Sequence, residues 1–136
     1  MSEASNAKHG ANEQPPASVA PVDESAAAFV SAITGGLPLT AQVFFAVVEA
    51  NGTLVRGVGA VSSARLGVGT YQVVFSQDVT GSAYLGTIGL TGNAGTSPAG
   101  QIAVVGRNGI PAGAYVQTFN ATGAAADRSF HLSVLS

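Results

Sequence analysis

Short stretches of alternating apolar and polar residues dominate the last two thirds of the chain. In the clearest of them, residues 70–77, large apolar side chains occupy every second position: Tyr71, Val73 and Phe75. A period of two is typical of a β-strand with one buried face. Similar runs, separated by glycine-rich breaks, lie at 83–91, 101–106, 114–120 and 129–135. Because no helical segments alternate with these runs, we predict an all-β domain, an antiparallel β-sandwich or jelly roll of about seven to eight strands.

A β-hairpin is predicted where this region begins. The apolar run 41–50 meets a second run, 53–61, at the dipeptide Asn51-Gly52. Both residues tolerate the positive φ that a type I′ turn requires at its two central positions, and this turn matches the twist of paired strands. Residues 62–69 are predicted to form a connection that contains a short strand-like piece.

The extreme C-terminus is unusually apolar. Phe130, Leu132 and Val134 recur at period two, although a chain terminus is normally polar and frayed unless a sheet holds it. We therefore predict that the last strand is central and buried, with His131 on its opposite face. In the run 83–91, the glycines Gly86 and Gly89 predict a bulge or a close backbone approach.

The first 36 residues differ from the rest. Residues 1–21 are polar, alanine-rich and interrupted by three prolines, which predicts an arm that is disordered alone and ordered only along a partner subunit. Residues 22–36 place Phe29 and Ile33 on one face at helical spacing and end in Gly35-Gly36, which predicts a short helix. This helix packs on the β domain, on copies of itself or on a larger host structure. The predicted β domain then spans residues 37–136.

Charge is scarce in this protein. Only 9% of the 136 residues are charged, against about 25% in a typical globular protein. Two interpretations remain open at even weight: a surface that meets other protein, or one covered by serine, threonine and glycine. The β region has no lysine and no basic patch, which argues against a nucleic-acid partner. No run of apolar residues is long enough to span a membrane. No signal peptide is visible, so we expect a cytoplasmic location before any release.

Catalytic chemistry has few candidates. The histidines are His9 and His131, and a hydrolytic triad needs such a base beside a nucleophile. The acidic residues of the β region are dispersed and stand beside turns or strand ends, and the chain has no cysteine for a thiolate site. We therefore predict no catalytic residues, no metal and no cofactor. A small hydrolase or isomerase is the least favoured hypothesis.

Two polar, glycine-rich loops at 92–100 and 107–113 are the predicted recognition loops, because long flexible loops tend to carry binding residues. The candidates within them are Asn93, Thr96, Arg107 and Asn108. If the ligand is a glycan, the aromatic candidates are Tyr84 and Tyr115, for which a place in the core is an equally good interpretation.

Candidates for a subunit interface come from the helix and from the last strand. They are Phe29, Ile33, Asp127, Arg128 and His131. Asp127 and Arg128 precede the last strand directly, and such a pair can join subunits through charge-assisted hydrogen bonds. A solvated turn is the alternative interpretation of this pair.

Two stretches, Arg65–Tyr84 and Tyr115–Asn120 followed by Asp127–Val134, resemble the C-terminal β-sandwich domains of bacteriophage tail fibres and related stand-alone small bacterial proteins. The resemblance covers roughly residues 41–136. It implies a sandwich that trimerises about a three-fold axis and serves as a distal tip, for binding a cell surface or for structure. It also implies a place on the surface of a virion or similar particle.

Two functional hypotheses follow. The leading one is a non-enzymatic homo-oligomer, a trimer by the resemblance, that docks on a larger tail or shell assembly through its arm and recognises a surface glycan or caps a structure. The alternative is a coat, shell or filament subunit that assembles without any ligand.

Overall fold

The computed structural model describes residues 14–17 and 42–136. The predicted helix at 22–36, with Phe29 and Ile33, lies outside the described residues, as does most of the predicted arm. Within the described residues the chain forms strands and no helix.

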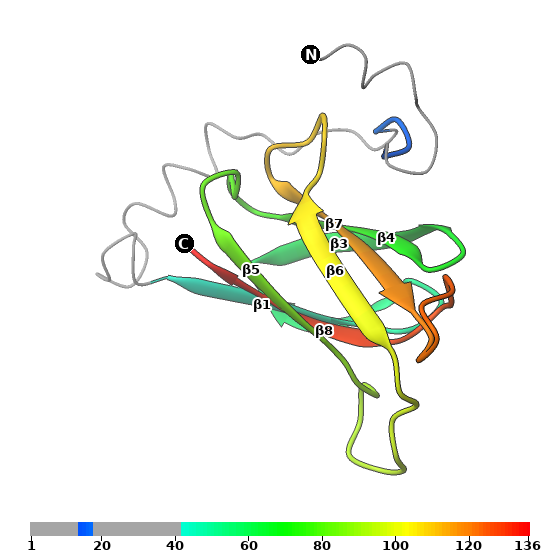
Figure 1. Cartoon of the computed structure of the whole chain (residues 1–136). Coiled ribbons are helices and arrows are strands. Elements are labelled where there is room, and N and C mark those ends of the chain that lie inside the picture. The colour runs from blue at the N-terminus through cyan, green and yellow to red at the C-terminus, as the bar shows by residue number, and fades with distance from the viewer. Residues whose placement is uncertain (1–13, 18–41) are drawn as a thin grey trace.

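Eight antiparallel strands form two four-stranded sheets (Figure 1). The strands are β1 (Val43–Val48), β2 (Leu54–Val58), β3 (Ala60–Gly67), β4 (Thr70–Phe75), β5 (Ala83–Ile88), β6 (Gln101–Gly106), β7 (Gly113–Phe119) and β8 (Phe130–Leu135). The first sheet has the order β2-β1-β8-β5 and the second has the order β3-β4-β7-β6. The predicted all-β sandwich is confirmed.

The core lies between the two sheets and takes alternate side chains from the central strands of each. Phe44 of the first sheet and Phe75 of the second have ring centroids 6.4 Å apart, and Tyr71 meets Phe130 edge to face at 5.1 Å. Edge-to-face rings add stabilisation beyond the area that they bury. The remaining buried members are Ala46, Val48, Val73, Val79, Ala114, Val116, Leu132 and Val134.

The C-terminal strand is central, as predicted. β8 pairs with β1 on one side and with β5 on the other over all six of its residues. Phe130, Leu132 and Val134 point into the core and are buried. His131 therefore lies on the outer face of the first sheet.

The hairpin of β1 and β2 is present, but its turn differs from the predicted type I′. Of the residues described, only glycines have positive φ, so Asn51 does not adopt it, whereas Gly52 does at 95°. The amide of Gly52 donates to the carbonyl of Glu49, and the amide of Glu49 donates to that of Thr53. This pattern is a type I turn closed by a left-handed glycine, the usual form of a three-residue hairpin loop. The hydroxyl of Tyr71 also donates to the Ala50 carbonyl at 2.6 Å, which anchors the turn.

The predicted single strand 53–61 and the predicted connection 62–69 are wrong. The chain instead leaves the first sheet at Val58 and enters the second at Ala60, and β3 is a full strand of eight residues. The pivot is Gly59, which has φ of 77° and packs against the ring of Phe44. A side chain there would be strained and would collide with that ring, so a glycine is needed where the strand changes sheets.

The sheets also approach each other on the opposite side, where β5 lies beside β6 (Figure 1). A Cβ on Gly86 would lie 2.9 Å from Ile102 and 3.0 Å from Val104. The absent side chain makes room for two apolar side chains of the facing strand. At Gly86 the close approach is thus by side chains and not by another backbone, and the pairing of β5 with β8 has no bulge.

Candidate functional site

The outer face of the first sheet is largely apolar. Strand register aligns its outward side chains in three rows: Val43, Leu135 and Ala83; Val58, Phe45, Ser133 and Leu85; and Arg56, Val47, His131 and Thr87. Large apolar members of the first two rows are exposed, and Leu85 is the most exposed at 59%. Exposed apolar side chains that gather in one patch mark interaction sites more often than isolated ones do. We call these three rows the apolar face.

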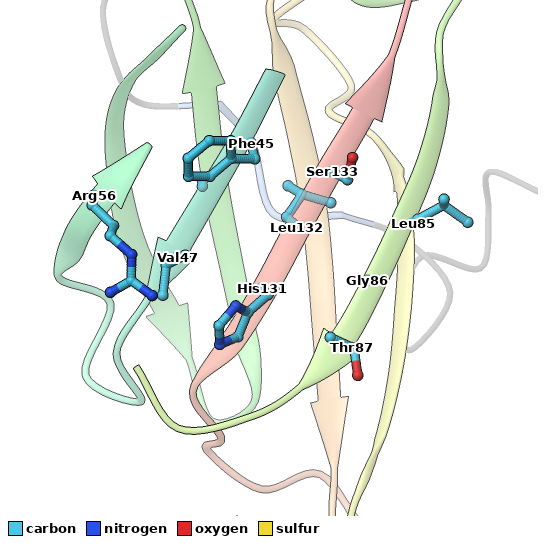
Figure 2. A pocket seen from close by; sticks show the side chains of 10 residues that line it. Phe45, Val47, Arg56, Leu85, Gly86, Thr87, His131, Leu132 and Ser133 are labelled. Carbon is cyan, nitrogen blue, oxygen red and sulfur yellow. The ribbon is translucent and has the colours of Figure 1, made fainter. Parts of the chain in front are cut away.

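A shallow depression of about 380 Å³ lies in the middle of the apolar face. Figure 2 shows its lining side chains on β1, β2, β5 and β8, including Phe45, Arg56, Leu85 and His131. The polar groups of the lining stand mainly in the third row, whereas Phe45 and Leu85 flank Ser133 in the second. The depression therefore offers an apolar contact surface with polar groups at one end.

The polar end is fastened by the loop that follows β5. Nε2 of His131 donates to the carbonyl of Leu90 at 2.9 Å, and Nη1 of Arg56 donates to the carbonyl of Thr91 at 2.7 Å. The hydroxyl of Thr91 donates to the carboxylate of Glu49 at 2.8 Å. These bonds hold the start of the long loop across the sheet. Arg56, the only charged side chain of the three rows, is thus already hydrogen-bonded within its own chain.

The outer face of the second sheet contains a buried arginine. Arg107 follows β6 and is only 4% exposed. Its Nε donates to the side-chain carbonyl of Gln72 at 2.5 Å, and its guanidinium lies 5.7 Å from the ring centre of Tyr115, which is a cation–π distance. Both neighbours are themselves buried. We call these three residues the Arg107 site.

The remaining side-chain bonds of Arg107 go to three residues of the N-terminal arm, Gln14, Pro15 and Pro16. Nη1 donates to the carbonyl of Pro15 at 2.6 Å and to the side-chain oxygen of Gln14 at 3.1 Å, and Nη2 donates to the carbonyl of Pro16 at 3.1 Å. Gln14 also donates to the Gly106 carbonyl at 2.8 Å and accepts from the amide of Asn108 at 2.8 Å. The arm segment thus supplies most of the acceptors for a cation that water hardly reaches.

Burial lowers the pKa of Arg107, and the nearby ring of Tyr115 opposes this change. Because an arginine side chain keeps its proton in proteins, the buried guanidinium remains charged and needs acceptors for its N–H groups. The arm carbonyls and the Gln72 side chain meet this need.

The loop 107–113 differs from the predicted polar and flexible loop. The amide of Arg107 donates to the carbonyl of Gly113, the amide of Ile110 donates to the carbonyl of Arg107, and the amide of Gly113 donates to the carbonyl of Ile110. Arg107, Ile110 and Ala112 are buried, and only Asn108 and Gly109 are exposed. The loop is a compact turn that positions Arg107.

The other predicted binding residues fall in different places. Asn93 and Thr96 are exposed in the loop between β5 and β6. Tyr84 is half-buried against the core, and its hydroxyl donates to the carbonyl of Val79 at 2.7 Å. Burial and the neighbouring Asp78 carboxylate raise the pKa of the Tyr84 hydroxyl. Tyr115 lies under the guanidinium of Arg107. Neither tyrosine belongs to the exposed loop 92–100.

Asp127 and Arg128 are bonded within the chain. The Asp127 carboxylate accepts from the amide of Gly69 at 2.8 Å and pairs with Arg65 at 3.0 Å. These two interactions hold the pKa of Asp127 below its usual value. Arg128 donates to the carbonyls of Ala99 and of Asp127 itself. Their part in a subunit interface stays a prediction.

Three or more histidine, aspartate or glutamate side chains nowhere converge into a possible metal site within the described ranges 14–17 and 42–136. The same part of the chain holds no helix long and apolar enough to cross a membrane. Two features were missed by sequence reasoning: the docking of Gln14–Ala17 and the apolar face. The consecutive prolines Pro15 and Pro16 are a signal of an extended segment that could have indicated the first.

Comparison of this chain with protein-family models, with curated proteins and with solved structures found no significant match. The functional argument therefore depends on the two outer faces of the sandwich.

Proposed function

We propose that this protein is a non-enzymatic β-sandwich that assembles with copies of itself through the apolar face, as a structural or surface-recognition unit of a larger particle. The exposed apolar side chains of Val43, Val58, Phe45, Leu85 and Leu135 are the observation that supports it. The trimeric state and the place at a particle surface come from the resemblance to tail-fibre tip domains.

The chemistry of the apolar face favours a second copy as its occupant. Its one charged side chain, Arg56, already donates to the Thr91 carbonyl within the chain, so the face offers little to a charged partner. A copy of the same face is equally poor in charge and brings no repulsion, and burial of exposed apolar area is the main favourable term in association. A chain with only 9% charged residues also has few groups that would keep copies apart.

The recognition part of the proposal concerns the loop between β5 and β6. Residues 92–99 are exposed and carry Asn93 and Thr96, whose side chains can hydrogen-bond to sugar hydroxyls. In an assembled particle this loop would present them outward, while the apolar face is buried. The burial of Tyr115 directs the search for a glycan contact to the loop side chains rather than to that ring.

The native mass of the full chain at several concentrations tests the assembly. We expect a defined oligomer, and we expect Leu85→Lys to dissociate it because each copy would bury an unpaired ammonium group. The matched control is Val61→Lys on β3, since Val61 is 55% exposed on the other sheet and Leu85 is 59% exposed. An oligomer unaffected by Leu85→Lys would contradict the proposed face, and a monomer at all concentrations would contradict the assembly itself.

A coat or filament subunit is the second candidate, and β2 favours it. This strand is an edge of the first sheet, and four of its five residues are exposed. Unpaired strand edges can pair with another chain and propagate. Particles that grow with concentration, and that stop growing in a Val55→Pro variant on this edge, would favour the filament over the closed oligomer.

A further inference from the structure

We propose that the Arg107 site is a peptide-binding site for an extended, proline-containing segment, and that in the assembled protein it is filled by the Gln14–Ala17 segment of a neighbouring copy. The exchange of arms would add a second link between subunits that the apolar face already holds together. This inference rests on the proposed function only in requiring that copies stand next to one another.

The receptor half of the site is built by the sandwich. Gln72 on β4 and Tyr115 on β7 are directly paired in register, and Arg107 extends across them from the turn after β6. The side-chain oxygen of Gln72 and the ring of Tyr115 fix the guanidinium plane from two sides. Its Nη1 and Nη2 donors are thereby presented in a fork of fixed geometry.

The ligand half is matched to those donors. Two consecutive prolines favour an extended polyproline II backbone, which has no internal hydrogen bonds and leaves its carbonyls free to accept. The carbonyls of Pro15 and Pro16 meet Nη1 and Nη2 respectively. Gln14 adds a donor and an acceptor that pair with the backbone of residues 106 and 108. The segment is therefore recognised by its carbonyls and by one glutamine, without any charged side chain.

The segment is separable from its own sandwich. Twenty-four residues, 18–41, lie between Ala17 and Gln42. At about 3.4 Å per extended residue they reach about 80 Å, more than twice the roughly 30 Å diameter of a compact domain of this size. The chain enters the sandwich at β1 of the first sheet, whereas the Arg107 site lies on the second. A connection of this length is long enough to reach the Arg107 site of a neighbouring copy.

The arm of a neighbouring copy adds a link between subunits that is made of hydrogen bonds rather than of contact between apolar faces. Once the apolar faces hold two copies together, binding of each arm becomes an intramolecular event within the oligomer, so a modest affinity suffices. Each copy is then joined to its neighbour by two separate surfaces. This division fits a chain that places its apolar face on one sheet and its peptide site on the other.

Disulfide trapping tests the exchange, because the natural chain has no cysteine. A Cβ placed on Gly109 would lie 3.3 Å from the Cβ of Ala17, close to the ~3.5–4.5 Å of a disulfide. Two full-length chains of different mass, one with Ala17→Cys and the other with Gly109→Cys, are co-expressed and oxidised. Since Gly109 has φ of 90°, a second pair uses Asn108→Cys, at the neighbouring exposed position, in its place.

We expect the mixed chains to form a covalent heterodimer, seen as a single mass on a non-reducing gel. Arg107→Met in the chain that carries Asn108→Cys or Gly109→Cys should reduce the yield of the heterodimer at least tenfold. Thr96→Cys, in the exposed loop 92–100, is the control position and should not cross-link to Ala17→Cys.

A chain that carries both cysteines separates the alternatives. If it closes only on itself while the native mass stays oligomeric, the arm binds its own sandwich and the exchange is overturned, although the proposed assembly stands. If the native mass is that of a monomer, the proposed assembly has failed first, and the closed loop then overturns the exchange as well.

Discussion

Each outer face of the sandwich is formed by a four-stranded sheet, but the two faces differ in how far their side chains are shielded from water. The second sheet places Gln72 and Tyr115 at its outer surface beside Arg107, and the guanidinium of Arg107 donates to three residues of the arm. The first sheet places Phe45 and Leu85 there and leaves them exposed in the described part of the chain. A polar network needs a specific partner for each atom, whereas an apolar face needs only area. We therefore expect the apolar face to contribute contact area to association, and the Arg107 site to contribute specificity for its partner.

The largest effect on stability is expected at the outer face of the second sheet, where Arg107 lies. Arg107→Met removes every guanidinium donor, so the Gln72 oxygen and the carbonyls of Pro15 and Pro16 lose the hydrogen bonds that they accept from it. We expect the free energy of unfolding to fall by about 2–4 kcal/mol, because hydrogen bonds to a charged group are worth roughly 1.5–3 kcal/mol each and only part is recovered by water. Urea titration followed by tyrosine fluorescence measures this loss. A change below about 0.5 kcal/mol would mean that the network does not stabilise the fold.

Gln72→Leu should have the next largest effect. The substitution keeps the side-chain volume but removes the one acceptor that the sandwich itself gives to Nε of Arg107. We expect a loss of about 1–2 kcal/mol, the cost of one unsatisfied buried donor. The same urea titration applies, with Ala103→Leu on an exposed position of β6 as a control that should be near neutral. If Gln72→Leu were equally neutral, the arm alone would be sufficient to satisfy the arginine.

Asp127→Asn tests a charge that lies on neither face. Because the pKa of Asp127 is lowered in the folded protein, its contribution is present above the ordinary aspartate pKa and is lost as pH falls through the lower folded value. We expect a loss of about 1 kcal/mol at pH 7, a hydrogen-bond value reduced for a carboxylate that is about one third exposed. Thermal melts from pH 7 to pH 2 should show a smaller decrease for the variant. Parallel curves for both proteins would contradict the assignment.

The smallest effect on the isolated subunit is expected at the apolar face. Leu85→Ser should change the free energy of unfolding of the monomer by less than about 0.5 kcal/mol, since the side chain is already mostly exposed. Unfolding is followed at a concentration where the protein is dissociated. A loss above about 1 kcal/mol under those conditions would show that Leu85 packs within its own chain.

Much of the fold was predictable because its signals are local. The alternation of Tyr71, Val73 and Phe75 identified β4, and the apolar C-terminus identified a central β8. The strand switch at Gly59 was not predictable in the same way, because residues 53–61 form one largely apolar run with two glycines, Gly57 and Gly59, and only the partner strands show at which of them the run changes sheets. The predicted type I′ turn at Asn51-Gly52 was wrong because this dipeptide is compatible with two loop lengths, and the register of β1 and β2 selects between them.

The two faces were harder to predict than the strands. The run Val43–Val48 is apolar at all six positions, a pattern typical of a strand covered on both sides, and this signal did point toward the apolar face. Arg107 was chosen as a binding candidate in an exposed loop, whereas its side chain is buried. Its burial depends on Gln72, 35 residues earlier, and on Gln14, 93 residues earlier, and such long-range contacts leave no local pattern.

The central position of β8 has a consequence for synthesis. β8 follows β1 and β5 in the sequence and joins them, so the first sheet remains two separate pieces until residues 130–135 have left the ribosome. During that interval the unpaired edges of β1 and β5 and the uncovered core are open to other nascent chains. A chain that stops before residue 130 would lack one of the two inner strands of the first sheet, and the truncated product would be a substrate for chaperones and proteases.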